Sequence, residues 1–345
     1  MKILKQVLGI DVAQKELVVS LGRKLEDLSI ELYAYHVFSN NSKGFNSLVN
    51  WVEKLTQEIK NIHFVMEATG VYHQKFAYFL EDKNLNVSIV LPNKISNYIR
   101  TLDIKTINDK TCSQAIAKFG LERKLAQWKR PKTIFKNLQQ LTRERGQIVD
   151  ERSIIKNQLH AENAEAEPNK GSLKRMKKRI QFLNSQEKEI KEEINEIIKS
   201  DPNLKNEVLN ICTIPGVGIL TAAIVLGETN GFELIQSSKQ LSSYAGLDVK
   251  EKQSGTSVKS KPRISKQGNK NLRKAMYLPA LSAVKWNQNY REDYARLVSK
   301  HGIKMKALVS TQRKLLELIY VIYKSKKGFD KEYEVKKNSV KAQEA

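Results

Sequence analysis

The sequence predicts an N-terminal α/β domain, a pair of long helices and a C-terminal helical domain. Short apolar runs alternate with helical patterns over the first hundred residues, which is the βαβ rhythm of a sheet with parallel pairs. From residue 134 onward, apolar side chains instead recur at steps of three and four. A chain of 345 residues also exceeds the size at which a single core usually stops growing, about 250 residues. We therefore expect two or three units, of the class α/β plus α.

The α/β region, residues 1–128, opens with apolar runs that predict a meander of three strands, at 7–10, 17–20 and 33–38. A helix is predicted from Gly44 onward. It is followed by a buried strand over 62–66 that leads into Glu67, a helix over about 72–82 and a further strand over 87–90.

The middle region, residues 129–200, has the pattern of an antiparallel coiled-coil hairpin. Apolar residues follow a helical register from Ile134 to Leu159, and the register resumes after a turn-forming cluster at 167–171. It is broken once, at Glu187. Such a hairpin can be a spacer between domains, a dimerising arm or an arm that grips nucleic acid, and the pattern is compatible with each.

The remainder divides into a helical domain over 201–325 and a tail. The pair Asp201-Pro202 ends the coiled-coil pattern, and a compact helical domain follows. Residues 326–345 are rich in Lys and Glu, which is typical of a frayed tail.

The charge of the chain indicates a nucleic-acid partner. Sixty Lys and Arg stand against 37 Asp and Glu, a net charge of +23 that attracts polyanions through counterion release. No run approaches the roughly 18 apolar residues that span a bilayer, so no membrane partner is expected. Cys112 and Cys212 form no CxxC pair, so neither a disulfide scaffold nor a zinc module is indicated, and the short N-terminal apolar run does not suit a secretory signal. We expect a cytoplasmic protein.

Three acidic residues stand at the ends of predicted elements. Asp11 follows the first strand, Glu67 ends a later strand, and Asp109 stands at the start of a predicted helix. Carboxylates at neighbouring strand ends can converge, and they would repel each other unless a divalent cation such as Mg²⁺ or Mn²⁺ lay between them. A metal site there could activate an attack on phosphate. Taken singly, the three residues also suit a turn, a surface acid and a helix cap.

Two features of the C-terminal domain suit phosphate binding. Gly216 and Gly218 lie in a segment that looks like a helix-hairpin-helix turn, whose backbone N–H groups can approach phosphate; a plain tight turn is the alternative. The stretch 250–274 holds nine Lys or Arg against one acid, Glu251, and indicates a flexible phosphate-binding loop rather than a merely solvated one. The candidate contacts in it are Lys259, Lys261, Arg263, Lys266, Lys270 and Arg273.

Several segments together resemble one family. The segments GIDVA from Gly9, MEATGVY from Met66 and NDKTCSQAIAKFG from Asn108, with the C-terminal features, are similar to the IS110-type DEDD transposases of insertion sequences. The resemblance covers nearly the whole chain. It implies an RNase H-like domain, akin to the RuvC-like Holliday-junction resolvases, that bears Asp, Glu and an Asp-x-x-Asp pair.

Asp11, Glu67 and Asp109 match the first three of these acids. The fourth place falls on Cys112, and a thiol is a poor ligand for Mg²⁺. Three acids can suffice, or Asp103 can compensate. By its own residue type Cys112 reads as a small residue on a helix face.

The resemblance also implies a serine that attacks DNA, and the matching Gln-Ser-Gly position is Ser254. Ser265 is the rival candidate, although a cap or a phosphate contact suits it better. The family is directed by a structured guide RNA encoded in its own element, which pairs with donor and target DNA, and its members act as dimers that pair into tetramers. The implied function is that of an RNA-guided serine recombinase.

Two other functions remain open from the residues themselves. The first is a metal-dependent endonuclease of the Holliday-junction type that uses Asp11, Glu67 and Asp109 while Ser254 is idle. The second is a catalytically decayed nucleic-acid-binding protein, in which Cys112 records the loss of metal binding.

Overall fold

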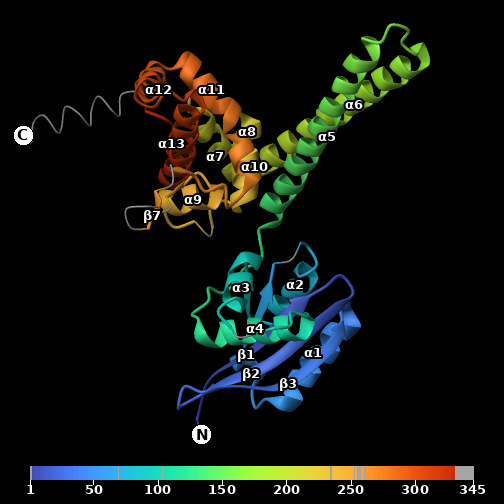
Figure 1. Cartoon of the computed structure of the whole chain (residues 1–345), viewed down its shortest axis with the longest axis vertical. Helices are drawn as coiled ribbons and strands as arrows, with labels where there is room; N and C mark the ends of the chain where they lie inside the picture. The colour runs from blue at the N-terminus through green and yellow to red at the C-terminus, as the bar shows by residue number, and fades with distance from the viewer. Residues whose placement is uncertain are drawn as a thin grey trace, which may run out of the picture. The chain divides into compact units, whose positions relative to one another are not determined.

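The computed structural model describes residues 2–68, 70–102, 104–233, 235–251 and 262–330, and the backbone alone of residues 253, 254, 258 and 259. The chain forms two compact units, Met1–Arg130 and Pro131–Ala345 (Figure 1). Asp103, Lys261 and residues 331–345 of the expected tail lie outside the described residues. The finer division at residues 128, 200 and 325 stays a prediction.

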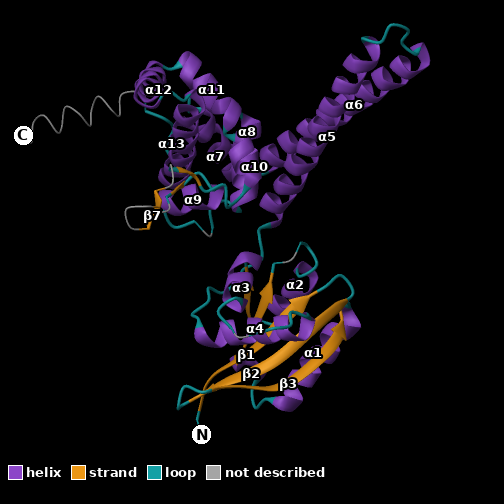
Figure 2. Cartoon of the chain, in the orientation of Figure 1, coloured by secondary structure: helices purple, strands orange, loops and turns teal. Residues whose placement is uncertain are grey.

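The first unit contains a five-stranded mixed sheet, drawn as the orange arrows of Figure 2, in the order β3-β2-β1-β4-β5. Strands β1, β2 and β3 form an antiparallel meander, and β4 and β5 run parallel to β1. This order, with three antiparallel and two parallel strands, is that of RNase H-like domains, so the predicted fold class is confirmed. The strands are Ile3–Val12, Glu16–Leu25, Ile30–Ser39, Ile62–Glu67 and Asn86–Val90.

Helices cover both faces of this sheet. Leu8 and Ile10 of β1 share one core with side chains of α1 and α2, and Val7 of β1 and Val65 of β4 share another with α3 and α4. Strand residues therefore alternate between two apolar layers, as expected for strands buried on both sides. The helices are α1 (Ser42–Leu55), the short 3₁₀ helix η1 (Ile59–Asn61), α2 (Gln74–Asp82), α3 (Pro92–Ile99) and α4 (Asp109–Glu122).

Helix α4 lies directly on β1, because Gly9 presents no side chain to it. A Cβ at Gly9 would stand 2.2 Å from the backbone nitrogen of Ala117 and 2.4 Å from the carbonyl oxygen of Ser113. A second contact fixes the same turn, since the hydroxyls of Ser20 on β2 and Ser113 share a buried hydrogen bond of 2.8 Å. At the far end of the helix, a Cβ at Gly120 would stand 2.7 Å from Val7. Helix α4 thus runs antiparallel to β1, with its N-terminus above the end of that strand.

The second unit begins with a helical hairpin of α5 (Thr133–Asn163) and α6 (Lys170–Ser200), two helices that lie side by side (Figure 1). The break in the apolar register, Glu187, is buried in the hairpin with 6% of its surface exposed. Its carboxylate pairs with Arg145 at 2.7 Å, Lys191 at 2.8 Å and Arg152. Burial alone would raise the pKa of Glu187, but these hydrogen bonds outweigh it and lower the pKa to about 2.

The rest of the unit is a bundle around one apolar core, to which the first turns of α5 also belong. Gly227 permits this contact, since a Cβ there would stand 2.8 Å from the backbone nitrogen of Gln139. In the described part of the chain no helix is long and apolar enough to cross a membrane. The helices are α7 (Pro202–Cys212), α8 (Ile219–Thr229), α9 (Ser238–Ala245), α10 (Lys270–Ala275), α11 (Tyr277–Trp286), α12 (Gln288–His301) and α13 (Lys304–Ser325).

Between α9 and α10 the chain forms two nested strand pairs, where the sequence predicts only a loop. Strand β6 (Val249–Lys250) pairs with β9 (Arg263–Ile264), and β7 (Gln253–Ser254) pairs with β8 (Val258–Lys259). Strands of two residues are too short to show an alternating pattern, so no sequence signal announces them. We call residues 248–265 the serine hairpin.

We expect Gly9→Ala to destabilise the protein by about 3 kcal/mol, the upper end of the usual cost of overpacking, because the new Cβ can only be accommodated by moving the backbone of α4. Urea unfolding followed by circular dichroism measures the change. Gly146→Ala is the matched control: its Cβ would have nothing within 4 Å, and alanine in a helix should stabilise by up to about 1 kcal/mol. Equal unfolding midpoints for Gly9→Ala and the wild type would contradict the close contact.

Glu187→Gln should lower the free energy of unfolding at pH 7 by on the order of 2 kcal/mol. The folded-state pKa of Glu187 lies near 2, below the ordinary value of 4.5, so its contribution is complete above about pH 5. The contribution is lost as the pH falls from there toward 2. The difference in urea midpoint between wild type and variant should therefore shrink over this range, and a difference that does not vary with pH would refute the ion cluster.

Candidate active site

Asp11 and Glu67 lie side by side at the ends of neighbouring parallel strands. The register pairs Gly9 with Val65 and Ile10 with Met66, so the next residues along are Asp11 on β1 and Glu67 on β4. Because side chains alternate along a strand, Asp11 shares the face of Gly9, and Glu67 shares the face of Val65. Gly9 and Val65 both face α4. The two carboxylates therefore occupy the α4 side of the sheet, on strands about 4.8 Å apart.

The first turn of α4 brings Asp109 to the same end of the sheet. The cap of this helix is Asn108, whose side chain accepts a hydrogen bond of 2.9 Å from the backbone of Thr111. The hydroxyl of Thr111 accepts one in return from the backbone of Asn108. This capping box satisfies the helix N-terminus without Asp109, so the plainer reading of Asp109 as the cap is wrong.

Hydrogen bonds link the segments that follow the strands carrying the acids. The Asn40 amide donates to the carbonyl of Ala13, after β1, at 2.8 Å and to that of Tyr72, after β4, at 3.3 Å. The backbone of Ala68 donates to the carbonyl of Val90 at 2.9 Å, which links the end of β4 to the end of β5. These bonds hold the strand ends that carry Asp11 and Glu67 in one place.

The acids interact electrostatically. Burial raises the pKa of Asp11, and repulsion from Asp109 and Glu67 raises it further, to about 6. Burial raises the pKa of the Cys112 thiol as well, and the charges of Asp11, Glu67 and Asp109 add to the rise. All four side chains thus lie within one electrostatic environment.

The donor set of this site suits a divalent cation. Three carboxylates offer hard oxygen ligands, and a cation would relieve the repulsion that raises the pKa of Asp11. Among the residues that the structure describes, no three His, Cys, Asp or Glu side chains already lie at metal-ligating distance. Ion binding would therefore have to draw the carboxylates together.

The serine hairpin carries Ser254 at the end of β7, where its backbone pairs with Val258. The side chains of Ser254 and Lys259 lie outside the described residues, as does Lys261. Ser265, the rival serine, closes the base of the hairpin: its hydroxyl donates to the carboxylate of Asp248 at 2.5 Å. That bond gives Ser265 a structural role.

A buried glutamate that the sequence analysis missed supports the base of this hairpin. The side chain of Glu228, on α8, is completely buried and receives both a 2.7 Å and a 2.8 Å hydrogen bond from Arg143 of α5. Asn269 and Asn271, at the start of α10, donate to it at 2.7 and 2.8 Å. Burial alone would raise the pKa of Glu228, but these bonds outweigh it and lower the pKa. The sequence signal that could have revealed Glu228 is its position as an acid within the otherwise apolar helix 219–229.

The predicted phosphate contacts fall into two groups. Arg263, Lys266 and Lys270 are exposed and available to a polyanion. Arg273 instead donates to the carbonyl of Ala245 at 2.7 Å and so caps the end of α9.

The predicted helix-hairpin-helix turn joins α7 and α8. Gly216 has a φ of +87° and packs against α11, where a Cβ would stand 2.6 Å from the carbonyl oxygen of Pro279, so packing alone explains this glycine. Gly218 is open to solvent at the N-terminus of α8.

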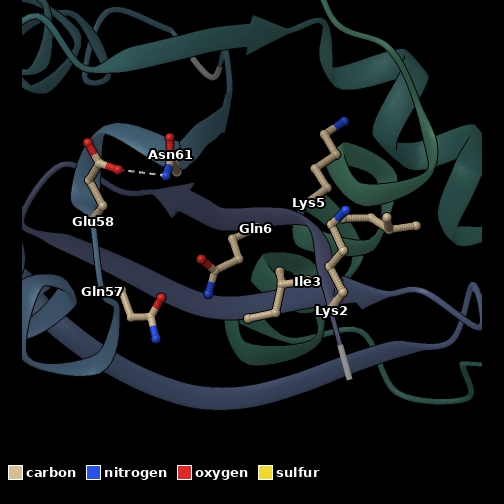
Figure 3. A pocket seen from close by; sticks show the side chains of 8 residues that line it. Lys2, Ile3, Lys5, Gln6, Gln57, Glu58 and Asn61 are labelled. Carbon is tan, nitrogen blue, oxygen red and sulfur yellow. Dashed lines mark hydrogen bonds between the residues drawn. The ribbon is translucent and has the colours of Figure 1, made fainter.

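A cavity of about 840 Å³ lies at the other end of the first unit's sheet (Figure 3). It is lined by residues of the first half of β1, among them Gln6, and by Glu58 and Asn61 ahead of β4. Asp11 and Glu67 lie at the opposite ends of these strands. The cavity is therefore no part of the acidic site.

Comparison with known proteins identifies the family. A DEDD transposase model of IS110 elements matches residues 8–162, and a second model, described as Transposase IS116/IS110/IS902 family, matches residues 209–295. The pilin gene-inverting protein of Moraxella lacunata is 30% identical over 300 residues, which cover 85% of this chain and 90% of that protein. The chain belongs to the IS116/IS110/IS902 family of transposases. It is a DNA transposase or recombinase with a DEDD domain.

Two further similarities accompany this assignment. The pilin gene-inverting protein of Moraxella bovis is 29% identical to this transposase over 297 residues, 85% of the chain and 90% of that protein. A structure of T. thermophilus RuvC in complex with a Holliday junction substrate has a TM-score of 0.25 and 13% identity. That match covers 36% of this transposase and 99% of the RuvC chain.

Glu228→Gln should destabilise the second unit of this transposase by about 3 kcal/mol, because it leaves Arg143 without its charged partner. It also sets an amide against Asn269 and Asn271, so we expect faster tryptic cleavage in the serine hairpin. Urea unfolding and limited proteolysis measure the two effects. Glu193→Gln, at an exposed position on α6, is the control and should change neither. If Glu228→Gln were destabilised but the rate of tryptic cleavage were unchanged, Glu228 would have no role in ordering the serine hairpin.

Proposed function

We propose that this transposase cuts and rejoins DNA strands with Ser254 as the nucleophile and with Asp11, Glu67 and Asp109 as ligands of an assisting divalent metal ion, Mg²⁺ or Mn²⁺. The observation that carries the metal site is that Asp11 and Glu67 directly follow the last paired residues of two adjacent parallel strands, on the side of the sheet that faces the helix beginning with Asp109. The repulsion among the three acids supports it.

The carboxylates of the acidic site would hold the metal ion, and their negative charge would be neutralised by it. When bound, the metal ion supplies positive charge to phosphate oxygens and favours ionisation of a coordinated hydroxyl. Asp11, with a pKa of about 6, is the carboxyl that gains a proton as the pH falls below neutrality. Protons therefore compete with the metal ion for Asp11, and metal binding should weaken as the pH falls through this value.

Ser254 would form a covalent bond to DNA. Its oxygen bonds to the phosphorus while one bridging P–O bond breaks, and the leaving sugar oxygen takes up a proton. A serine hydroxyl is a weak nucleophile until a base, a metal ion or nearby cations favour its ionised form. We propose that the basic residues of the serine hairpin, or the metal ion of the acidic site, provide this help. Attack by a second hydroxyl on the phosphoserine would rejoin the strands and free Ser254.

The partners follow from the charge and the family. Exposed Arg263, Lys266 and Lys270, together with Lys259 and Lys261, would hold the phosphates of donor and target DNA. We further propose that a structured guide RNA from the same element selects the sequence, and that the protein acts as a homodimer that assembles into a tetramer. The work would take place in the bacterial cytoplasm, at the nucleoid.

Ser254→Ala should abolish a covalent protein–DNA adduct that the wild type forms. Purified protein, element-derived RNA, labelled donor and target DNA and Mg²⁺ are combined and resolved on a denaturing gel. Ser265→Ala is the matched control and should retain the adduct, because the Ser265 hydroxyl is bonded to Asp248.

The other results of this experiment distinguish the alternatives. Cleavage that survives Ser254→Ala without an adduct, but is lost in Asp11→Asn, would replace the proposal with a metal-dependent endonuclease. Binding of DNA and RNA without cleavage under any divalent ion would indicate a decayed element.

A further inference from the structure

We infer that Cys112 supplies a sulfur ligand to the acidic site, which makes this site bind Zn²⁺ or Cd²⁺ more tightly than Mg²⁺. The inference rests on the proposed metal site and names the class of ion that binds there most tightly, besides the Mg²⁺ or Mn²⁺ proposed to assist the reaction. It concerns a departure from the family pattern, in which the fourth position carries an acid.

The backbone places Cys112 beside the carboxylates. Cys112 lies three residues after Asp109, and positions three apart are neighbours on a helix surface. The next residue, Ser113, is held against the sheet by its hydrogen bond to Ser20 and by the contact of its carbonyl with Gly9. This turn of α4 therefore cannot move away from the end of β1, where Asp11 follows Gly9 by two residues.

The electrostatic environment of Cys112 differs from that of Cys212. Cys112 is a free, half-buried thiol in the field of three carboxylates, Asp11, Glu67 and Asp109. Cys212, on α7, is also free and half-buried, but burial and not a neighbouring charge raises the pKa of its thiol. The chain thus holds two thiols of similar exposure, one beside the acids and one apart from them.

The chemistry of the combined donor set decides the ion. Mg²⁺ requires an octahedron of oxygen ligands and does not accept sulfur. Zn²⁺ accepts Cys sulfur together with Asp and Glu oxygen, in four-coordinate sites. One thiolate and three carboxylates are four donors of these kinds, which the ion would have to draw to ligating distance, since among the described residues no three such side chains already lie that close. On binding, the Cys112 thiol loses its proton to solvent and the sulfur bonds to the ion, with no change of oxidation state.

Cadmium titration of the full-length, metal-free protein tests this inference. A sulfur–cadmium bond produces an ultraviolet charge-transfer band, which reports the ligand and not the activity. We expect one equivalent of Cd²⁺ to saturate the band in the wild type and in Cys212→Ser. Cys112→Ser should lose the band, and its Cd²⁺ affinity should fall at least about tenfold, the loss that follows even from removing an outer partner of a metal ligand. Cys112→Asp should lose the band and bind Mg²⁺ more tightly than the wild type.

Paramagnetic resonance of bound Mn²⁺ distinguishes a failure of the Cys112 ligand from a failure of the metal site itself. If Mn²⁺ binds the wild type but not Glu67→Gln, and no cadmium band forms or the band persists in Cys112→Ser, the role of Cys112 is overturned and the acidic site stands. If neither Mn²⁺ nor Cd²⁺ binds at Glu67, the proposed metal site itself is overturned. Circular dichroism of each variant confirms that it is folded.

Discussion

The acidic site depends on the direct contact between the backbone of α4 and strand β1 at Gly9. No side chain separates helix and strand there, and the buried Ser20–Ser113 hydrogen bond fixes their register. Packing of this kind leaves little freedom, because a protein interior has few voids into which a helix can shift. Asp109 and Cys112 are consequently carried to the end of β1, where Asp11 stands. Gly9, which takes no part in the chemistry, thus sets the position of two of the side chains at the site.

In the second unit, buried ion pairs fix how the helices pack, as the backbone contact at Gly9 does in the first unit. Glu187 of α6 joins the two helices of the hairpin through Arg145 and Arg152 of α5, and Lys191 of its own helix adds a third ion pair. Glu228 joins α5, α8 and the start of α10. A buried ion pair adds little net stability over an apolar pair of the same shape, but it permits few alternative arrangements. These carboxylates therefore specify which surfaces meet, while the shared apolar core provides the driving force.

Much of the first unit is predictable from the sequence, because each strand is long enough to show its pattern. The acids Asp11 and Glu67 could be placed at neighbouring strand ends for the same reason. The closeness of α4 could not, since it depends on the pairing of Gly9 with residues over a hundred positions away. Glu187 was visible only as a break in a register, and the partners of Glu228 come from three separate segments. Ser254 is singled out by family resemblance alone, because a serine in a basic loop has no physical signature of nucleophilicity.

The Glu228 cluster has a consequence for protein engineering. Both carboxylate oxygens are committed, to Arg143 on one helix and to Asn269 and Asn271 beside the hairpin. None of these donors lies within residues 248–265, so a serine hairpin grafted from a homologue over that range would leave every hydrogen bond to this carboxylate in place. The hairpin is accordingly an interchangeable module, and the cluster beside it, Arg143, Glu228, Asn269 and Asn271, belongs to the host.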